Sequence, residues 1–302
     1  MKDMTATGYV LYNLSAGFET KLDSIYPLKE MITDELVFQN IQEIDDFAAF
    51  FKGLSPEDYV ILCGGDGTIN RFVNLCEGMD FNHRILYFPT GTGNDFAADL
   101  GYSKGCRPFE INDYLKDLPF VTVNGETHRF LNGIGYGIDG YCCEVGDELK
   151  KIPGKKINYT AIAIKGLLFY FKPVTAKVRV DGKEDSFRKV WIAPTMNGRF
   201  YGGGMMPTPA QDRLNKDKTV SLMLFHGTGK LKTLMIFPSI FKGTHVNHKE
   251  AIWIRQGHEI SVEFDRPVAL QIDGETHLNV TSYSVCTAKK AVEKAELVTA
   301  KA

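Results

Sequence analysis

A glycine-rich segment near residue 65 has the residue types of a phosphate site. The segment reads Gly64-Gly65-Asp66-Gly67-Thr68; it follows a short apolar run, 59–63, and precedes helical spacing over 69–76. Glycines let backbone N–H groups approach a phosphate, and a helix N-terminus adds partial positive charge. Because Asp66 would repel a bare phosphate, its presence favours an intervening Mg²⁺ or a substrate hydroxyl. The structural alternative is a tight strand-to-helix turn.

A second glycine loop follows the predicted strand at 84–88. It reads Pro89-Thr90-Gly91-Thr92-Gly93-Asn94-Asp95 and precedes a short predicted helix, Phe96 to Leu100. Asn94 and Asp95 stand at the natural N-cap of that helix. Alone, the segment would be a capped turn. Two glycine loops at one edge of one sheet favour a shared phosphate site.

A third glycine cluster lies in the segment Asn197 to Met205, which contains three consecutive glycines. Three glycines are too flexible for the interior of a strand. They indicate either a backbone that makes room for a ligand or a mobile loop, and the sequence leaves both open.

One internal echo pairs Asn124-Gly125-Glu126-Thr127-His128 with Asp273-Gly274-Glu275-Thr276-His277. Asn-Gly and Asp-Gly between apolar runs are strong hairpin signals, so both segments predict hairpins. The pattern alone assigns a catalytic role to neither hairpin.

Composition excludes several classes of protein. The 302 residues are 44% hydrophobic and 24% charged, as in a globular protein, so wholesale disorder is excluded. Lys plus Arg is 35 and Asp plus Glu is 37, a net charge of −2, so no nucleic-acid partner is expected. The six Cys lack zinc-type spacing, which favours reduced thiols in a cytosol. The first residues lack the apolar stretch of a signal peptide, and no uncharged apolar run approaches the ~20 residues of a membrane span, so neither element is expected.

The hydrophobic pattern changes near residue 120. Before it, strands, glycine loops and helices alternate, which predicts an open parallel α/β sheet with its loops at one edge. After it, short strands separated by turns predict an antiparallel sandwich or barrel. These strands are expected at 121–123, 174–180, 190–195, 220–225, 251–254, 259–264, 268–272 and 278–285, with helices at 159–171 and 230–241.

With these segments in view, the sequence resembles the diacylglycerol kinase catalytic-domain family, which includes bacterial lipid kinases and sphingosine kinases. The matching segments run in the family's order over nearly the whole chain: 13–17, 64–68, 89–97, 197–205 with Pro209, and 273–275. Gly-Gly-Asp-Gly-Thr is shared with NAD kinases. The Gly-Thr-Gly-Asn-Asp-Phe and Gly-Gly-Gly-Met elements favour the lipid-kinase branch, and the Gly-Ser-Thr-Ala-Tyr stretch of NAD kinases is missing from the sequence.

The resemblance implies a Rossmann-like α/β nucleotide-binding domain over 1–120 and a β-sandwich-like lipid-substrate domain over 121–287. The tail 288–302 could return to the first domain. It further implies ATP and Mg²⁺ as cofactors, with Asp66 organising the metal carried by ATP. The implied nucleotide-binding residues are Asn13, Gly64, Gly65, Gly67, Thr68, Gly91, Thr92, Asn94 and Asp95.

For catalysis, the resemblance implies Glu275 as the general base with Asp273 assisting. In the sphingosine branch the residue matching Asp66 is held to be the base. Arg71 and Ala98 replace the family's usual Glu and Arg, which leaves altered or lost activity open. The family's metal-binding Asp-Gly-x-x-Asp is reduced to Asp217-Lys218-Thr219-Val220-Ser221, so Asp217 is a doubtful ligand of a structural Mg²⁺.

The expected function is therefore an ATP-dependent lipid kinase that phosphorylates the hydroxyl of a diacylglycerol-like lipid. We expect a cytoplasmic protein that works at the inner face of a membrane, with a homodimer as one option. The apolar segment 159–171 with its lysines would suit a bilayer surface, but a helix packed on the β-domain with solvated lysines is the favoured interpretation. The alternatives are a small-molecule kinase of the NAD-kinase type and a non-catalytic nucleotide- or lipid-binding protein.

Overall fold

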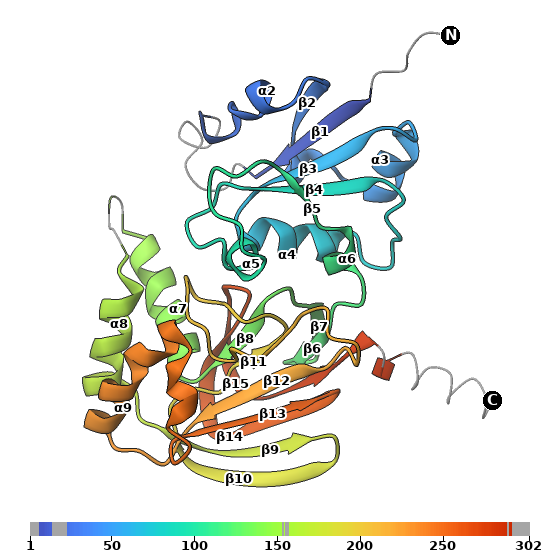
Figure 1. The fold of residues 1–302 in the computed structure, drawn as a ribbon. Coiled ribbons are helices and arrows are strands. Elements are labelled where there is room, and N and C mark those ends of the chain that lie inside the picture. Colours follow the sequence, from blue (N-terminus) through green and yellow to red (C-terminus); the bar gives the residue numbers. More distant parts are fainter. Residues whose placement is uncertain (1–5, 14–22, 153, 155–156, 289, 292–302) are drawn as a thin grey trace, which may run out of the picture. The chain divides into compact units, whose positions relative to one another are not determined.

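The computed structural model describes residues 6–13, 23–152, 154, 157–288 and 290–291 (Figure 1). The chain separates into two compact units, Met1–Lys116 and Asp117–Ala302. Each unit has its own sheet. All six Cys are free thiols, as the sequence predicted.

The first unit is built on a five-stranded sheet in the order β2-β1-β3-β4-β5. Its strands are β1 (Thr7–Tyr12), β2 (Glu35–Asn40), β3 (Tyr59–Gly64), β4 (Arg84–Pro89) and β5 (Phe109–Glu110). The first four strands run parallel, and β5 pairs with β4 in the antiparallel sense. The predicted parallel sheet is confirmed, with an added antiparallel edge strand.

Short helices connect these strands. They are α2 (Leu28–Met31), η1 (Ile41–Glu43), α3 (Phe47–Gly53), α4 (Asp66–Leu75), α5 (Asp95–Asp99) and α6 (Asn112–Leu115). β3 reads Tyr-Val-Ile-Leu-Cys-Gly and is buried on both faces, the pattern of a central parallel strand. Val10, Ile61 and Phe88 pack one core of this unit. The sequence analysis missed β2, α2 and α3, which are only six, four and seven residues long and too short to show a clear period.

The second unit contains a ten-stranded antiparallel sheet. Its main path is β13-β12-β11-β8-β14-β15-β6-β7, and β9 joins β14 to β10. The strands are β6 (Phe120–Val123), β7 (Glu126–Arg129), β8 (Gly133–Tyr136), β9 (Val174–Val180), β10 (Lys183–Val190), β11 (Thr195–Met196), β12 (Val220–Phe225), β13 (Ile252–Gly257), β14 (Glu259–Ile272) and β15 (Glu275–Cys286). The predicted antiparallel class is confirmed.

Helices of this unit lie together beside the sheet (Figure 1). They are α7 (Ile138–Lys150), α8 (Tyr159–Lys165), the π-helical turn η2 (Gly166–Tyr170), α9 (Lys230–Ile236), η3 (Phe237–Lys242) and η4 (Thr244–Asn247). Ile138, Leu167 and Ile236 from three of these helices share a core with Trp191 and Phe225. A second core, between the strands, contains Tyr136, Val178 and Leu270.

Five predicted elements differ from the structure. The strand predicted at 190–195 is wrong: β10 ends at Val190, and only an isolated bridge at Ile192 precedes β11. The strands predicted at 259–264 and 268–272 are one strand, β14, because register shifts after Glu263 absorb the Pro267 segment without ending the pairing. The helices predicted at 159–171 and 230–241 each change type part-way along.

Among the described residues, none of the helices combines the length and apolar character needed to cross a membrane.

Candidate active site

The carboxyl ends of three neighbouring parallel strands form the candidate phosphate edge of the first unit (Figure 1). Asn13 follows β1, the first glycine loop follows β3, and the second follows β4. Carboxyl ends of parallel strands are where open α/β sheets bind ligands. The rest of the first matching segment, 14–17, lies outside the described residues.

The two glycine loops touch through their backbones. Thr90 N and Gly91 N donate hydrogen bonds to Gly64 O, at 2.9 and 3.0 Å. A Cβ on Gly91 would lie 2.4 Å from the Cα of Gly65, closer than any real contact allows. Gly91 is therefore required by the approach of the loops, and the two predicted segments form one structure.

Asp66 joins the loops through its carboxylate. Its Oδ2 accepts a hydrogen bond from Asp95 N at 2.9 Å, and its Oδ1 accepts one from Phe96 N at 2.7 Å. These N–H groups belong to the first turn of α5, so Asp66 caps that helix from a distance of 29 residues. The sequence argument gave this charge a metal or substrate role only, and missed its structural one.

Asn94 is the N-cap residue of α5, as predicted, but its side chain does not cap the helix. Its backbone is left-handed at φ 52°. Its Nδ2 donates to Gly91 O at 2.8 Å, and its Oδ1 accepts from the Tyr87 hydroxyl at 3.3 Å. The predicted capping side chain is thus wrong, because Asn94 fixes the loop while Asp66 supplies the cap.

Thr68 and Gly67 have different surroundings. Thr68 is buried and folds over the strand end, since a Cβ on Gly64 would lie 2.1 Å from Thr68 Oγ1. Gly67 is exposed in the first turn of α4, and a Cβ there would meet no atom within 4 Å. Its φ lies outside the left-handed range, so neither packing nor backbone geometry requires a glycine at 67. The space over Gly67 is where a phosphate could meet the start of α4.

We therefore expect Gly67→Ala to separate stability from ligand binding. Alanine in the first turn of α4 should leave the free energy of unfolding unchanged or raise it by up to about 1 kcal/mol. The added methyl should weaken ATP binding by about tenfold or more, since it fills the approach to the N–H groups. Denaturant unfolding and calorimetric ATP titration of the same preparation check both parts. An alanine variant with unchanged ATP affinity would contradict the phosphate assignment.

The remaining predicted nucleotide residues lie on the second loop. Thr92 and Gly93 are exposed, whereas Asn94 and Asp95 are buried. Thr90 is half-buried, so Thr92 is the most exposed side chain of this loop.

In the second unit, Asp273 is held by backbone N–H groups. Its carboxylate accepts hydrogen bonds from Leu131, Asn132 and Gly133, at 2.5, 2.8 and 2.9 Å. Asp273 N donates back to Gly133 O at 3.0 Å. The N–H groups belong to the two residues before β8 and to its first residue, so Asp273 fastens the β14–β15 turn to the start of that strand. A carboxylate whose two oxygens accept three backbone N–H groups is better suited to fixing the turn than to assisting the base, the role that the family resemblance implied.

Glu275 is exposed at the start of β15, where it pairs with Ile272 across a two-residue turn. Asp273 and Gly274 have φ values of 46° and 93°, as a type I′ turn requires. Burial lowers the pKa of the neighbouring His277, and His128 lowers it further, while the Glu275 carboxylate acts in the opposite direction. A solvent-facing carboxylate beside a histidine can accept a proton from a hydroxyl.

The echo hairpin has the same backbone. Asn124 and Gly125 have φ values of 51° and 85°, and Val123 pairs with Glu126 across the turn. Both predicted hairpins are confirmed. Glu126 is exposed, and its Oε2 lies 3.5 Å from His128 Nε2. The hairpins differ in the first residue of the turn. The side-chain amide of Asn124 donates one hydrogen bond, from Nδ2 to Leu278 O at 3.3 Å. The carboxylate of Asp273 instead accepts three hydrogen bonds from backbone N–H groups.

The glycine cluster at 202–204 forms a turn. Gly202, Gly203 and Gly204 have φ values of 62°, 81° and 106°, and Tyr201 and Met205 exchange two backbone hydrogen bonds around them. Left-handed backbone at three successive residues explains the glycines without a ligand. The turn itself is thus a third explanation, beside the ligand approach and the mobile loop that the sequence left open.

Asp139 is a buried carboxyl group that the sequence analysis missed. It lies in the first turn of α7, and Tyr201 donates a hydrogen bond from its hydroxyl to Asp139 Oδ2. Burial raises the pKa of Asp139 from 3.8 to about 7, which the Tyr201 bond partly offsets. A lone Asp between glycines carries no signal of burial, and its partner lies 62 residues away.

The raised pKa predicts that stability falls as the pH rises. The folded state holds a proton on Asp139 that the unfolded state releases above pH 4, so stability drops between pH 4 and pH 7. We expect the free energy of unfolding to be roughly 2 kcal/mol lower at pH 7.5 than at pH 5.5 from this group alone. Asp139→Asn should remove that part of the slope in urea titrations at the two pH values. An unchanged slope would mean that Asp139 titrates normally.

Comparison with known proteins covers both units. The sequence profile of the diacylglycerol kinase catalytic domain matches residues 7–117. The profile of the YegS C-terminal NAD kinase beta sandwich-like domain matches residues 132–289. The chain belongs to the diacylglycerol kinase family. This confirms the resemblance drawn from the glycine loops and the Asp-Gly-Glu turn.

Relatives in this diacylglycerol kinase family are distant in sequence. A Mycobacterium tuberculosis protein named diacylglycerol kinase is 27% identical over 210 residues, which cover 67% of this chain and 65% of the relative. The chain thus matches slightly less than two thirds of that relative's length. A Bacillus subtilis diacylglycerol kinase is 26% identical, over 76% of this chain and 74% of its own length.

A solved structure shares the fold of this diacylglycerol kinase family member. It comes from Bacillus anthracis strain Sterne and is described as a candidate diacylglycerol kinase. The TM-score is 0.63 at 19% sequence identity, with 95% of this chain and 96% of the other chain covered.

The segment around Asp217 differs in sequence from the metal-binding Asp-Gly-x-x-Asp of the diacylglycerol kinase family. Asp217 is exposed, and the described residues contain no group of three or more His, Cys, Asp or Glu placed to hold a metal. Asn215 closes this turn instead, since its Oδ1 accepts from Thr219 N at 2.9 Å. Lys218 stands where the family pattern has Gly, and its Nζ lies 3.6 Å from Asp117 Oδ2. These residues do not fit a structural Mg²⁺.

The other two departures from the diacylglycerol kinase family pattern lie on the surface. Arg71 is exposed on α4 and Ala98 is exposed on α5. Neither side chain fills the core, so neither substitution disturbs the packing of the glycine loops.

Proposed function

We propose that this chain is a lipid kinase that transfers the γ-phosphoryl group of ATP to the hydroxyl of a diacylglycerol-like lipid. The observation that carries the proposal is the exposed approach to Gly67 at the start of α4, beside a second glycine loop. Membership of the diacylglycerol kinase family supports a lipid over a soluble acceptor. Catalysis of this kind rests mainly on positioning and charge neutralisation.

The first unit would hold ATP through the start of α4 and the loop around Thr92. Mg²⁺ carried by ATP would neutralise charge on the phosphates. Asp66 would supply the carboxylate for such an ion, since hard cations prefer oxygen ligands, and the same carboxylate accepts hydrogen bonds from Asp95 N and Phe96 N. The structural Mg²⁺ of the family forms no part of the proposal.

In the second unit, Glu275 would accept the proton of the lipid hydroxyl. Its carboxylate is exposed, whereas both oxygens of Asp66 already accept backbone N–H groups. A proton taken up by Asp66 would compete with those bonds. Glu275 is therefore the better base, with Asp273 fixing the turn that presents it. We place the reaction at the cytoplasmic face of a membrane, where such a lipid is available.

The proposal predicts ADP release that depends on both a lipid acceptor and a divalent cation. ADP formation should be measured with dioleoylglycerol in mixed micelles, with NAD, and without an acceptor. Release with diacylglycerol alone, stopped by EDTA and restored by Mg²⁺, is the expected result. Release with NAD instead would indicate the small-molecule kinase, and ATP binding without release would indicate a non-catalytic protein.

A further inference from the structure

Two short helical segments of the second unit expose large apolar side chains. On α8 and η2, Ile164, Phe169 and Tyr170 have exposed fractions of 39%, 72% and 68%. On α9, Leu231 and Met235 have exposed fractions of 74% and 80%. Four of these five side chains are more than two thirds exposed, which is unusual for residues of this size. We call these five residues the α8–α9 apolar surface.

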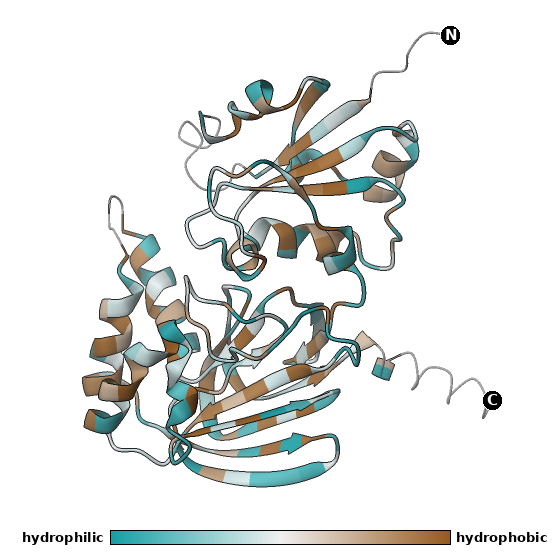
Figure 2. Ribbon diagram, in the orientation of Figure 1, coloured by the Kyte–Doolittle hydropathy of each residue, from teal (hydrophilic) through white to brown (hydrophobic). Residues whose placement is uncertain are grey.

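The two segments are neighbours. Lys230 at the start of α9 donates a hydrogen bond from Nζ to Leu168 O in η2, at 2.7 Å, and α9 and η2 contact each other. Leu231 and Met235 are four residues apart and share one face of α9, while Ile236 on another face enters the core. Figure 2 shows α8 and α9 side by side with strongly hydrophobic residues along both. Exposed apolar side chains gathered on adjacent segments mark an interaction surface.

Charge indicates what the surface contacts. The segments 159–172 and 230–242 contain five Lys and no Asp or Glu, in a chain whose net charge is −2. Lys165, Lys172 and Lys230 are exposed, and Lys232 pairs with Glu250 at 2.9 Å. The apolar surface of a protein partner could cover these side chains, but it would not by itself explain the excess of lysines. Apolar side chains bordered by lysines match an anionic bilayer, whose headgroups attract lysine and whose acyl region accepts Phe, Leu and Met.

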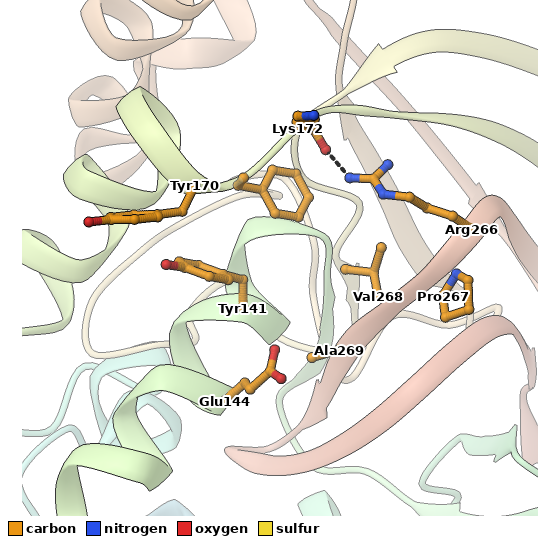
Figure 3. A pocket seen from close by; sticks show the side chains of 9 residues that line it. Tyr141, Glu144, Tyr170, Lys172, Arg266, Pro267, Val268 and Ala269 are labelled. Atoms are coloured by element: carbon orange, nitrogen blue, oxygen red, sulfur yellow. Dashed lines mark hydrogen bonds between the residues drawn. The ribbon is translucent and has the colours of Figure 1, made fainter.

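A pocket continues this surface into the unit. Its volume is about 260 Å³, and Tyr170 and Lys172 line it together with Tyr141, Glu144 and Arg266 (Figure 3). Arg266 donates a hydrogen bond to Lys172 O, and its guanidinium lies 5.8 Å from the Phe171 ring centroid. The two cationic residues outnumber the single acid, Glu144, at the pocket. Room for part of a lipid therefore adjoins the α8–α9 apolar surface.

We propose that the α8–α9 apolar surface binds an anionic lipid bilayer, with Phe169, Leu231 and Met235 in the headgroup–acyl boundary and lysines among the headgroups. The physiological purpose of this contact, presenting lipid to the enzyme, rests on the proposed function. The contact itself does not, because it needs neither ATP nor a reaction. It can therefore be tested separately.

The test is sedimentation of the full chain with vesicles, without ATP. Vesicles of phosphatidylcholine with 30% phosphatidylglycerol (about one lipid in three) are compared with pure phosphatidylcholine vesicles. We expect binding to the anionic vesicles, weakened about tenfold or more by Leu231→Gln with Met235→Gln. Leu75→Gln is the matched control, because Leu75 is also exposed, at 47%, on a helix. That change should leave binding unaltered.

A second pair of variants tests the charge. Lys165→Gln with Lys172→Gln should weaken binding to anionic vesicles by about tenfold, and Lys183→Gln with Lys249→Gln, which removes the same charge elsewhere, should have little effect. Wild-type binding should also weaken in 0.5 M salt (roughly a 4 Å screening length). Melting temperatures of all variants should match that of the wild type, since every altered side chain is exposed.

The outcomes separate the two proposals. If the Leu231/Met235 and the Lys165/Lys172 double variants both bind anionic vesicles as tightly as the wild type, the proposed bilayer contact is wrong, whatever the kinase activity. If these double variants lose vesicle binding but still phosphorylate detergent-dispersed diacylglycerol at the wild-type rate, both proposals are supported. If the protein binds vesicles but phosphorylates no lipid, the bilayer contact is supported and the proposed lipid kinase activity is wrong. Variants that turn a dimer into a monomer in sedimentation velocity, with vesicle binding unchanged, would assign the surface to a second copy of the chain.

Discussion

Glu275→Gln is expected to lower the rate of lipid phosphorylation by about a hundredfold or more, as for loss of a general base. Gln keeps the size of the side chain and the β14–β15 turn, but it cannot accept a proton. Glu275 is exposed, so the free energy of unfolding should change by less than about 0.5 kcal/mol. ATP affinity should survive, because the glycine loops belong to the other unit. Initial rates with one lipid and calorimetric ATP titration measure both quantities.

The chain supplies a matched control for this change. Glu126→Gln alters the same position of a hairpin with the same two-residue turn and an equally exposed carboxylate. It should leave the rate nearly unchanged. Equal effects of the two changes would mean that hairpin structure, and not proton transfer, explains both.

Asp66→Asn is expected to lower phosphoryl transfer by a hundredfold or more. The amide removes the charge proposed to organise Mg²⁺–ATP. It also turns an N–H donor toward Asp95 N or Phe96 N, so one cap of α5 is lost. That loss should lower the free energy of unfolding by roughly 1–3 kcal/mol. Rates should therefore be measured well below the melting temperature, together with an unfolding curve.

A variant that loses a helix cap elsewhere in the same unit separates the effect of Asp66→Asn on catalysis from its effect on stability. Asp46 caps α3 through a 3.0 Å bond from Ala49 N and is exposed. Asp46→Ala should lower stability by about 1 kcal/mol and leave the rate intact. Near-normal turnover of Asp66→Asn would remove Asp66 from the reaction. An inactive Asp66→Asn beside a fully active Glu275→Gln would transfer the base to Asp66, as in the sphingosine branch.

The glycine loops could be predicted from sequence because their signal is local. Gly64 and Gly91 each follow a buried apolar strand, and neighbouring parallel strands must bring such loops to one edge. The Asn-Gly and Asp-Gly turns were predictable for the same reason, since two residues specify each turn. The resemblance, not the pattern, distinguished Glu275 from Glu126.

The helix α7 could not be predicted because its glycines serve tertiary contacts. Gly140 lies inside this helix, where a Cβ would come 1.7 Å from Ala269 O on β14. Gly146 would likewise clash with the Tyr159 ring. In sequence, such glycines indicate a loop. Only the packing of α7 against β14 shows that they permit close approach.

The roles of Asp66 and Asp139 were hidden for a related reason. Each carboxylate meets its partners across a long stretch of sequence: Asp66 caps a helix that begins 29 residues later, and Asp139 meets a tyrosine 62 residues later. Spacing within one element cannot show such contacts. The sequence therefore singled out Asp66 for a metal or substrate role and missed its capping of α5.

The most direct test of the central claim is the chemical destination of the γ-phosphoryl group. The full chain should be incubated with γ-³²P-ATP, Mg²⁺ and dioleoylglycerol in mixed micelles, and the products separated into lipid, nucleotide and inorganic phosphate. The account predicts that label enters a phosphatidate-type lipid, with one labelled lipid formed for each ADP released. Label found only in inorganic phosphate, on NAD added as a competing acceptor, or in unreacted ATP would contradict it.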